Sequence, residues 1–169
     1  MTGEELLPVI NEEGEFIKLA PRSRCHDGHS MLLHPVIHLH LVDKEKRIFL
    51  QKRSVNKDIQ PGKWDTSVGG HVDPGEDIEQ ALLREAREEA GLVDFEYTLI
   101  DKYIWQSDLE REMVHSYYAV TNHTPVPDPD EIDEARYWSR NEIEENLGKG
   151  IFTPNFEHEY LHVLKNLTY

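Results

Sequence analysis

The sequence predicts one domain of the α/β or α+β class, in which helices pack on the faces of a mixed β-sheet. Segments with the alternation, or the β-branched and aromatic residues, of strands come before and after a long helical pattern at residues 77–90. The length of 169 residues suits one globular domain better than two, and a hydrophobic content of 38% is enough for a core. We therefore expect residues 1–169 to form a single domain.

The expected elements follow in order along the chain. Two short strands around Gly14 predict a hairpin over about residues 7–20. Residues 35–42 alternate, which predicts a strand, and we interpret the face with His38 and His40 as the polar face of a half-buried strand. Turn residues predict loops at 53–64 and 122–130. Further strands are expected at 47–51, 66–72, 95–105, 113–121 and 135–139, and helices at 77–90, 140–147 and 155–167.

Composition limits the classes of partner and location. A net charge of −15 argues against nucleic-acid duplexes and anionic membranes, because like charges repel. A phosphorylated small molecule remains compatible, since a bound divalent metal can attract it locally. The single cysteine, Cys25, rules out a disulfide framework within the chain. The sequence has no apolar stretch of membrane-spanning length and an acidic N-terminus unlike a signal peptide, so we expect a cytoplasmic protein.

Three glutamates lie on one side of the helix predicted at residues 77–90. Glu85, Glu88 and Glu89 stand at positions i, i+3 and i+4, which places them within an arc of about 100° on a helical wheel. Ile78 and Ala81 fall inside the same arc, so the acidic cluster borders the inward face. Carboxylates at this spacing repel one another by roughly a few tenths of a kcal/mol per pair, and burial raises the cost.

A bound divalent cation would remove that cost. Oxygen ligands suit Mg²⁺, which proteins commonly hold through a few carboxylates together with substrate phosphates. Arg84 and Arg87 are expected to project to the other side of the helix, from which they can orient or partly neutralise the cluster. A salt-bridged surface helix explains the mixture of Arg and Glu equally well. Spacing alone does not decide between these two interpretations.

Residues 70–92 resemble the Nudix box, in which Gly, Glu and Arg stand at fixed distances. The pattern of that box is G-x5-E-x7-R-E-U-x-E-E-x-G-U, where U is usually a bulky aliphatic residue. Ala86 is the one soft departure, because it is small where a larger residue is common. The matching positions are Gly70, Glu76, Arg84, Glu85, Glu88, Glu89, Gly91 and Leu92.

The resemblance implies an α/β/α sandwich with a mixed sheet, and hydrolysis of a diphosphate linked to another group. It implies that Glu76 and Arg84 form a structural and orienting pair. The metal, Mg²⁺ or Mn²⁺, would bridge phosphate oxygens and lower the pKa of an attacking water. The implied metal ligands are Glu85, Glu88, Glu89 and a backbone carbonyl near Gly69 or Gly70.

Outside the box, the chain resembles the isopentenyl diphosphate isomerase branch of this superfamily over roughly residues 9–120. Leu33-His34, Pro61-Gly62-x-Trp64 and Glu110-Arg111-Glu112 are among the segments that carry the resemblance. The match around His26 needs a shift of one residue. In that branch the corresponding residues hold a metal, which implies a second metal site formed by His26, His34, His71, Glu110 and Glu112. The basic residues that would hold the diphosphate are Arg22, Arg53 and Lys57.

One position departs from the isomerase pattern. The isomerases place a catalytic cysteine directly before the Gly-His step, and this chain has Gly69 there, while Cys25 lies in a different segment. Without that thiol, protonation of an isolated alkene lacks one acid/base partner. The Nudix box, which isomerases usually lack, is complete. We therefore expect a metal-dependent hydrolase acting on a nucleoside diphosphate derivative or another small diphosphate, with the isomerase as the alternative.

Several points stay open at the level of sequence. Glu112, Glu131 and Glu134 compete for the role of general base. A catalytically silent binding module is a third hypothesis, although the intact glutamate trio argues against it. Trp64 and Trp105 could stack on a ring of the substrate, but large aromatic residues more often belong to the core. The oligomeric state is open, a homodimer included.

Overall fold

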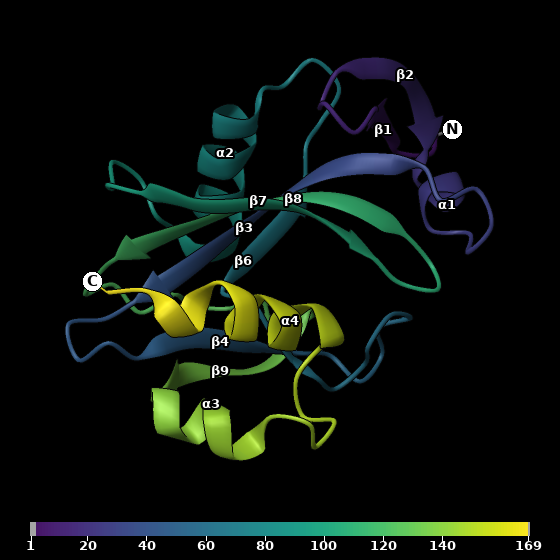
Figure 1. The fold of residues 1–169 in the computed structure, drawn as a ribbon. Helices are drawn as coiled ribbons and strands as arrows, with labels where there is room; N and C mark the ends of the chain where they lie inside the picture. Colours follow the sequence, from purple (N-terminus) through teal and green to yellow (C-terminus); the bar gives the residue numbers. More distant parts are fainter. Residues whose placement is uncertain (1–2, 169) are drawn as a thin grey trace.

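The computed structural model describes residues 3–168, and its central feature is a mixed β-sheet of seven strands (Figure 1). β3 (Leu33–Val42) lies in the middle, parallel to β8 (Arg111–Val120) and antiparallel to β6 (Val68–His71). The alternation of residues 35–42 had predicted this strand. The presence of both parallel and antiparallel pairs confirms the predicted mixed sheet.

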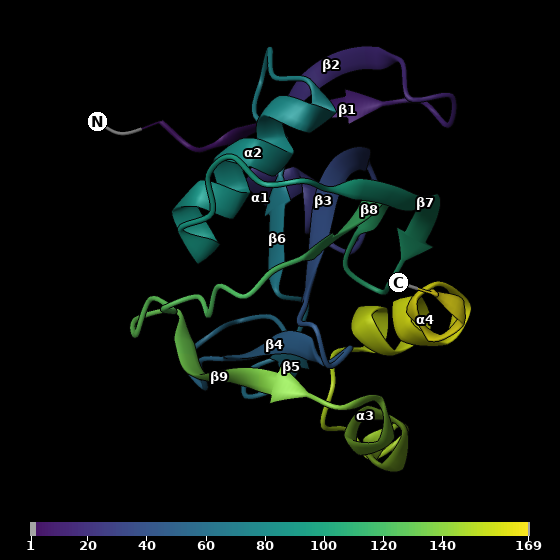
Figure 2. The ribbon, with the colours of Figure 1, turned by 90° about the vertical axis from the view of Figure 1, so that its left-hand side faces the viewer.

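The remaining strands divide the sheet into two groups. β7 (Thr98–Gln106) borders β8 at one edge. β4 (Ile48–Arg53) meets β3 through the pair Val42 and Ile48 and then diverges from it. Beyond that pair it adjoins β5 (Trp64–Asp65) and β9 (Ile132–Trp138). Figure 2 shows β4, β5 and β9 as a layer apart from β3, β6 and β8.

The N-terminal hairpin forms as predicted. β1 (Leu6–Ile10) and β2 (Phe16–Pro21) pair antiparallel, and their turn holds Gly14 at φ 85°, a conformation that glycine adopts at little cost. α1 (Arg22–Cys25) follows directly and was not predicted, because four residues are too few to show a helical period. β1 packs against β3 and α1, which brings this region next to the central sheet.

The long helix also matches its prediction. α2 (Ile78–Ala90) begins at a capping box, in which Asp77 accepts from the Gln80 backbone N–H and the Gln80 side chain accepts from the Asp77 N–H. It ends at Gly91, whose φ of 67° closes the last turn. α2 packs against β3 and β6 on one side of the sheet (Figure 1).

Two helices from the C-terminal part lie on the other side (Figures 1 and 2). α3 (Arg140–Asn146) has a capping box at Ser139, and α4 (Pro154–His162) is capped by Thr153. The helix predicted at 155–167 is thus shorter than expected, and a 3₁₀ turn, η1 (Leu164–Asn166), follows it. Helices on both sides of a mixed sheet confirm the predicted α/β/α arrangement.

The core corrects one interpretation of β3. Its aliphatic face packs against Ala81, Leu82 and Ala86 of α2, as a half-buried strand would. The opposite face is also buried, because His34 and His40 are fully inaccessible. β3 is therefore covered on both faces, and its histidines lie inside the protein. Trp64 belongs to a second core cluster beside α3 and α4.

The described loops agree with the sequence prediction. Residues 53–64 contain no helix or strand apart from their two end residues, and 122–130 contain none. Within the described residues, no helix is both long enough and apolar enough to cross a membrane.

Candidate functional site

The predicted glutamates lie where α2 meets β6. The backbone N–H of Gly69 donates to Glu89 Oε2 at 3.2 Å. At Gly70, a Cβ atom would collide with the carboxylate of Glu85, so this close approach requires glycine. Glu88 is more accessible, with 55% of its side chain exposed. The structure therefore brings Glu85 and Glu89 together with the Gly69–Gly70 backbone, and leaves Glu88 at the rim.

Arg84 takes a different path from the predicted one. It was expected to project to the side of α2 away from the glutamates, yet its guanidinium donates to Glu85 at 2.7 Å and to Glu76 at 2.8 Å. It also donates to the backbone carbonyl of His71 at 3.0 Å. A long, flexible side chain can turn back along the helix surface to reach buried acceptors. Arg84 thereby ties α2 to β6, whereas Arg87 is exposed as expected.

Burial makes this glutamate pair costly to ionise. Desolvation, with added repulsion from Glu85, raises the pKa of Glu89 to about 8. Burial likewise raises the pKa of Glu85, although Arg84 opposes the shift. A divalent cation between the two carboxylates would favour the charged form of both. Closely spaced oxygen donors that need a positive charge fit a Mg²⁺ or Mn²⁺ ion.

A second group of ligand-type side chains comes from four separate segments. One ligand atom from each of its residues lies within 4.8 Å of the others, and the members are His26, His34, His71 and Glu112. Glu110, the fifth predicted member, places a carboxylate oxygen 2.8 Å from Nε2 of His26, although the geometry of this contact is not that of a hydrogen bond. The Nε2 atom of His34 is buried and has no hydrogen-bond partner in the described part of the chain. An unpartnered buried imidazole nitrogen aimed at a carboxylate fits a metal site.

Two histidines of this second group, His34 and His71, favour their neutral form. Burial, with added repulsion from His34, lowers the pKa of His71 to about 3. Burial also lowers the pKa of His34. Neutral imidazole is the form that binds metals. Burial is the main cause of the raised pKa of both Glu89 and Glu112, and the charge of Asp65 raises each pKa further. Asp65 therefore lies close enough to interact electrostatically with both the α2 glutamates and the second group.

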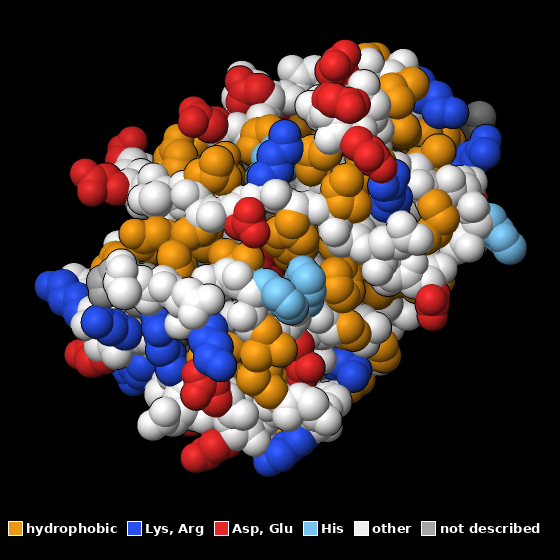
Figure 3. All heavy atoms as spheres, viewed as in Figure 1, with side chains coloured by type: hydrophobic (Ala, Val, Ile, Leu, Met, Phe, Trp, Pro, Cys, Tyr) orange, Lys and Arg blue, Asp and Glu red, His pale blue; other side chains and the backbone are white. Residues whose placement is uncertain are grey.

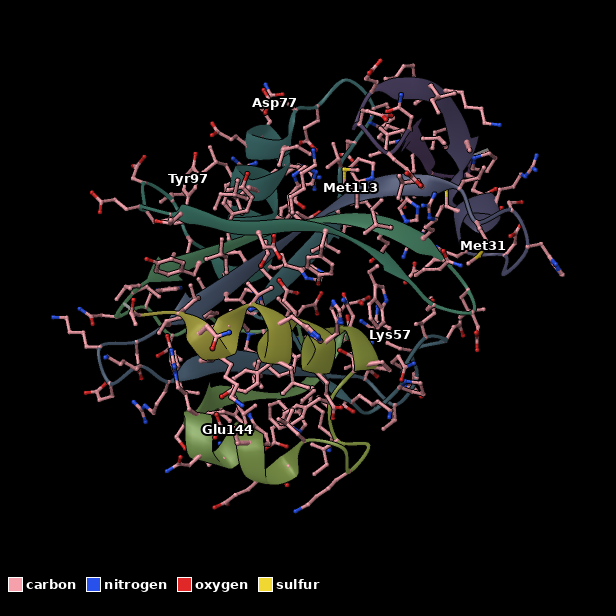
Figure 4. All side chains as sticks on the ribbon, in the orientation of Figure 1. Met31, Lys57, Asp77, Tyr97, Met113 and Glu144 are labelled. Atoms are coloured by element: carbon pink, nitrogen blue, oxygen red, sulfur yellow. The ribbon has the colours of Figure 1, made fainter. Side chains whose placement is uncertain are left out.

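The three predicted basic residues share one cavity. Arg22, Arg53 and Lys57 line a cavity of about 610 Å³ together with His26, which connects it to the second group. Arg22 pairs with Glu5 at 3.0 Å, and Arg53 with Asp65 at 3.5 Å. Lys57, labelled in Figure 4 in the loop between β4 and β5, pairs with Glu131. Each cation is thus partly balanced by a carboxylate at the rim.

The candidate general bases differ in position. Glu112 is buried among the histidines, whereas Glu131, in the turn before β9, and Glu134, on β9, are exposed. Trp105, considered for ring stacking, lies 5.2 Å from His158 between ring centroids. His158 in turn stacks on His162 at 4.3 Å. Figure 3 shows histidine side chains at the centre of this face of the molecule.

Sequence analysis missed one buried cluster. Glu159 of α4 accepts hydrogen bonds from the rings of His38, at 2.6 Å, and His40, at 2.9 Å. The hydroxyl of Tyr103 also donates to it, at 3.0 Å. Glu159 stands 121 residues after His38, and glutamate is a residue type that is mostly exposed. A hint was available, because Glu159 shares a helix face with the apolar Phe156 and Tyr160.

Comparisons with known proteins agree on one family. A family model described as NUDIX domain matches residues 32–162. An isopentenyl-diphosphate Delta-isomerase of Clavibacter sepedonicus is 33% identical over 143 residues, which cover 79% of this chain and 73% of that protein. A Nudix hydrolase of Listeria monocytogenes, named as uncharacterized, is 31% identical over 141 residues, which cover 80% of this chain and 81% of that protein. A solved structure from Deinococcus radiodurans matches with a TM-score of 0.75 at 23% identity, and the match covers 88% of this chain and 92% of that one. At this identity the match supports the fold alone.

Proposed function

The chain belongs to the Nudix family, and on that premise we propose that it is a metal-dependent hydrolase of a nucleoside diphosphate derivative or another small diphosphate. The observation that carries the proposal is the packing of Glu85 and Glu89 against Gly69 and Gly70. Two desolvated carboxylates at that place need a cation. Three basic side chains line a nearby cavity in which a diphosphate can bind.

In this proposal the glutamates of α2 hold Mg²⁺ or Mn²⁺ together with the carbonyl of Gly70. When bound, the metal supplies positive charge for the phosphate oxygens and makes a water more acidic. Arg84 keeps Glu85 in place, and Glu76 fixes Arg84 through hydrogen bonds of 2.8 and 3.0 Å. Glu85, Glu89 and Arg84 thus carry the catalytic constellation, with Glu88 adding a ligand from the rim.

Glu112 is the general base that we favour. Its burial and its interaction with Asp65 support this choice, whereas Glu131 pairs with Lys57 at the surface. His26, His34, His71, Glu110 and Glu112 are proposed to hold a second divalent metal. That metal would keep Glu112 ionised despite its burial.

The isomerase alternative is supported by the same histidine group and by the names of the relatives. Against it stands Gly69, which provides no side chain for proton transfer. A silent binding module is disfavoured by the intact glutamates. Hydrolysis needs a metal, a water and a base, and the described residues can provide the ligands and the base.

A panel of diphosphates tests the function. We expect the purified protein to release phosphate from at least one nucleotide-linked or other small diphosphate when Mg²⁺ or Mn²⁺ is added, and to do so far more slowly with EDTA. The products are separated by ion-exchange chromatography, which identifies the bond that breaks. A complete lack of cleavage across nucleoside diphosphates, dinucleotides and non-nucleotide diphosphates would count against a hydrolase.

Replacement of Arg53 tests the diphosphate cavity. Arg53→Lys keeps the charge but loses the planar fork that binds two oxygens, so we expect KM to rise about tenfold, which corresponds to 1.4 kcal/mol. We expect Arg53→Ala to raise it further while the protein stays folded. Arg47→Lys, beyond the other end of β4 and paired with Asp43, is the matched control. Unchanged KM and kcat in Arg53→Ala would show that the diphosphate binds elsewhere.

A further inference from the structure

The buried cluster around Glu159 is an ion network that connects α4 to the central sheet. Oε2 of Glu159 accepts from His38 Nδ1 at 2.6 Å and from the Tyr103 hydroxyl at 3.0 Å, while Oε1 accepts from His40 Nε2 at 2.9 Å. Asn155, also on α4, donates to the Tyr103 hydroxyl at 3.0 Å. Both carboxylate oxygens are therefore occupied by protein donors. His38, His40 and Glu159 are close enough together to bind a metal, but these hydrogen bonds already use both carboxylate oxygens. Nδ1 of His40 is buried and has no hydrogen-bond partner among the described residues.

The network favours a positive charge on His38. Glu159 is fully buried, and a buried carboxylate is stable only with a cation and hydrogen-bond donors beside it. Burial opposes the charge of His38, but Glu159 outweighs that effect and raises the pKa of His38 to about 9. The interactions with His38 and His40 likewise keep the pKa of Glu159 well below its usual value, despite burial. The short hydrogen bond from Nδ1 to a buried carboxylate favours the protonated ring of His38, which carries a proton on each nitrogen.

The second N–H of His38 points away from Glu159. Because Nδ1 is used by the carboxylate, Nε2 lies on the other edge of the ring, and no hydrogen bond to it is formed by the described residues. Cδ2, which is bonded to Nε2, lies 3.6 Å from the position that a Cβ on Gly69 would take. The His38 side chain is 12% exposed, whereas that of His40 is fully inaccessible. The missing side chain at Gly69 therefore leaves this edge of the ring open.

The ring of His38 lies beside Gly69, one of the residues that contact the glutamates of the proposed catalytic site. His38 pairs with Gly69 across β3 and β6, and the same glycine binds Glu89 through its N–H. His38 also interacts electrostatically with Glu112 of the second group. A fixed N–H donor with a full charge binds phosphate oxygens about twice as strongly as a neutral donor.

We propose that His38 is a further substrate-binding residue, whose Nε2–H donates to a phosphate oxygen of the bound diphosphate, and that Glu159 positions it. This inference rests on the proposed function for the identity of the ligand. In this proposal His38 adds a donor from the sheet, in β3, to the basic side chains of the cavity. The ring is held by the network, so binding costs it little conformational entropy.

Pyrophosphate binding tests the inference without requiring turnover. His38→Asn is the main variant, because the Asn amide reaches about as far as Nδ1 and can keep the contact with Glu159, while it removes the outer N–H. By isothermal titration with Mg²⁺ present, we expect His38→Asn to bind inorganic pyrophosphate at least about tenfold more weakly than the wild type. His115→Gln, a partly buried histidine on the neighbouring β8, should bind it normally.

Glu159→Gln tests the positioning role. If Glu159 acts through His38, the losses in the two single variants will not add in the double variant, whereas a general structural role would give additive losses. Should Glu159→Gln fail to fold, His38→Asn alone decides. Wild-type affinity in folded His38→Asn, or no pyrophosphate binding by the wild type, would overturn the inference. If His38→Asn binds pyrophosphate more weakly, as expected, but the wild type hydrolyses no diphosphate, the result contradicts the proposed function and not the inference.

Discussion

Glu89→Gln is expected to lower turnover at least ~100-fold, because it removes a negative ligand from the proposed metal site, and the metal held there would stabilise the negative charge that develops in the transition state. Gln keeps the shape of the side chain and can still accept from the Gly69 N–H. The loss is therefore expected in kcat, with little change in the fold. Steady-state hydrolysis of the best diphosphate from the panel, at saturating Mg²⁺, measures it.

Stability provides a control for the same variant. Since burial raises the pKa of Glu89 to about 8, the folded state without metal disfavours its ionisation. Stability is full below the unfolded pKa of about 4.5 and falls as pH rises through 8. In EDTA at pH 8, Glu89→Gln should therefore melt at or above the temperature of the wild type.

Two comparisons make the Glu89 result specific. Glu79→Gln, an exposed change in the first turn of the same helix, should leave activity intact. His71→Gln should lower the content of tightly bound transition metal, measured by elemental analysis after dialysis, because it removes a ligand of the second group. Full activity in EDTA, or an unimpaired Glu89→Gln enzyme, would disprove the metal assignment at α2.

Isopentenyl diphosphate is expected to remain unconverted when it is incubated with the protein and Mg²⁺. Isomerisation adds a proton to one carbon and removes one from another while the diphosphate stays whole, so it needs a second acid/base group beside the alkene. Gly69 leaves that place without a side chain. Chromatography of the intact diphosphates measures the dimethylallyl product.

Gly69→Cys is the matched variant for this prediction. A Cβ at this position would meet His38 at 3.6 Å, an ordinary contact, so the substitution is expected to fold. It should restore at most a trace of product, because a single substitution adds the thiol without adjusting the residues around it. A curated isomerase relative serves as positive control. Robust conversion by the unmodified protein would overturn the hydrolase proposal and would require Cys25 or Glu112 to supply the proton.

Local rules determined much of the fold from the sequence. The capped helix ending at Gly91, the alternating strand at residues 35–42 and the hairpin around Gly14 all form as predicted, because each depends on neighbouring residues. Two short elements were not predicted. α1 and β5 contain four and two residues, which is less than one period of any pattern that a sequence can show.

The sequence alone also predicted the glutamate helix and the family of the chain, because the spacing of residues within one helix does not depend on the rest of the fold. Only the tertiary structure decided how distant segments combine. It turned Arg84 toward Glu76 and Glu85, where hydrogen bonds outweigh the direction that a helical wheel suggests. It also covered the second face of β3 with α4 and placed Glu159 beside His38, 121 residues earlier. A buried charge is stable only beside its partner, and that partner is chosen by packing rather than by proximity along the chain.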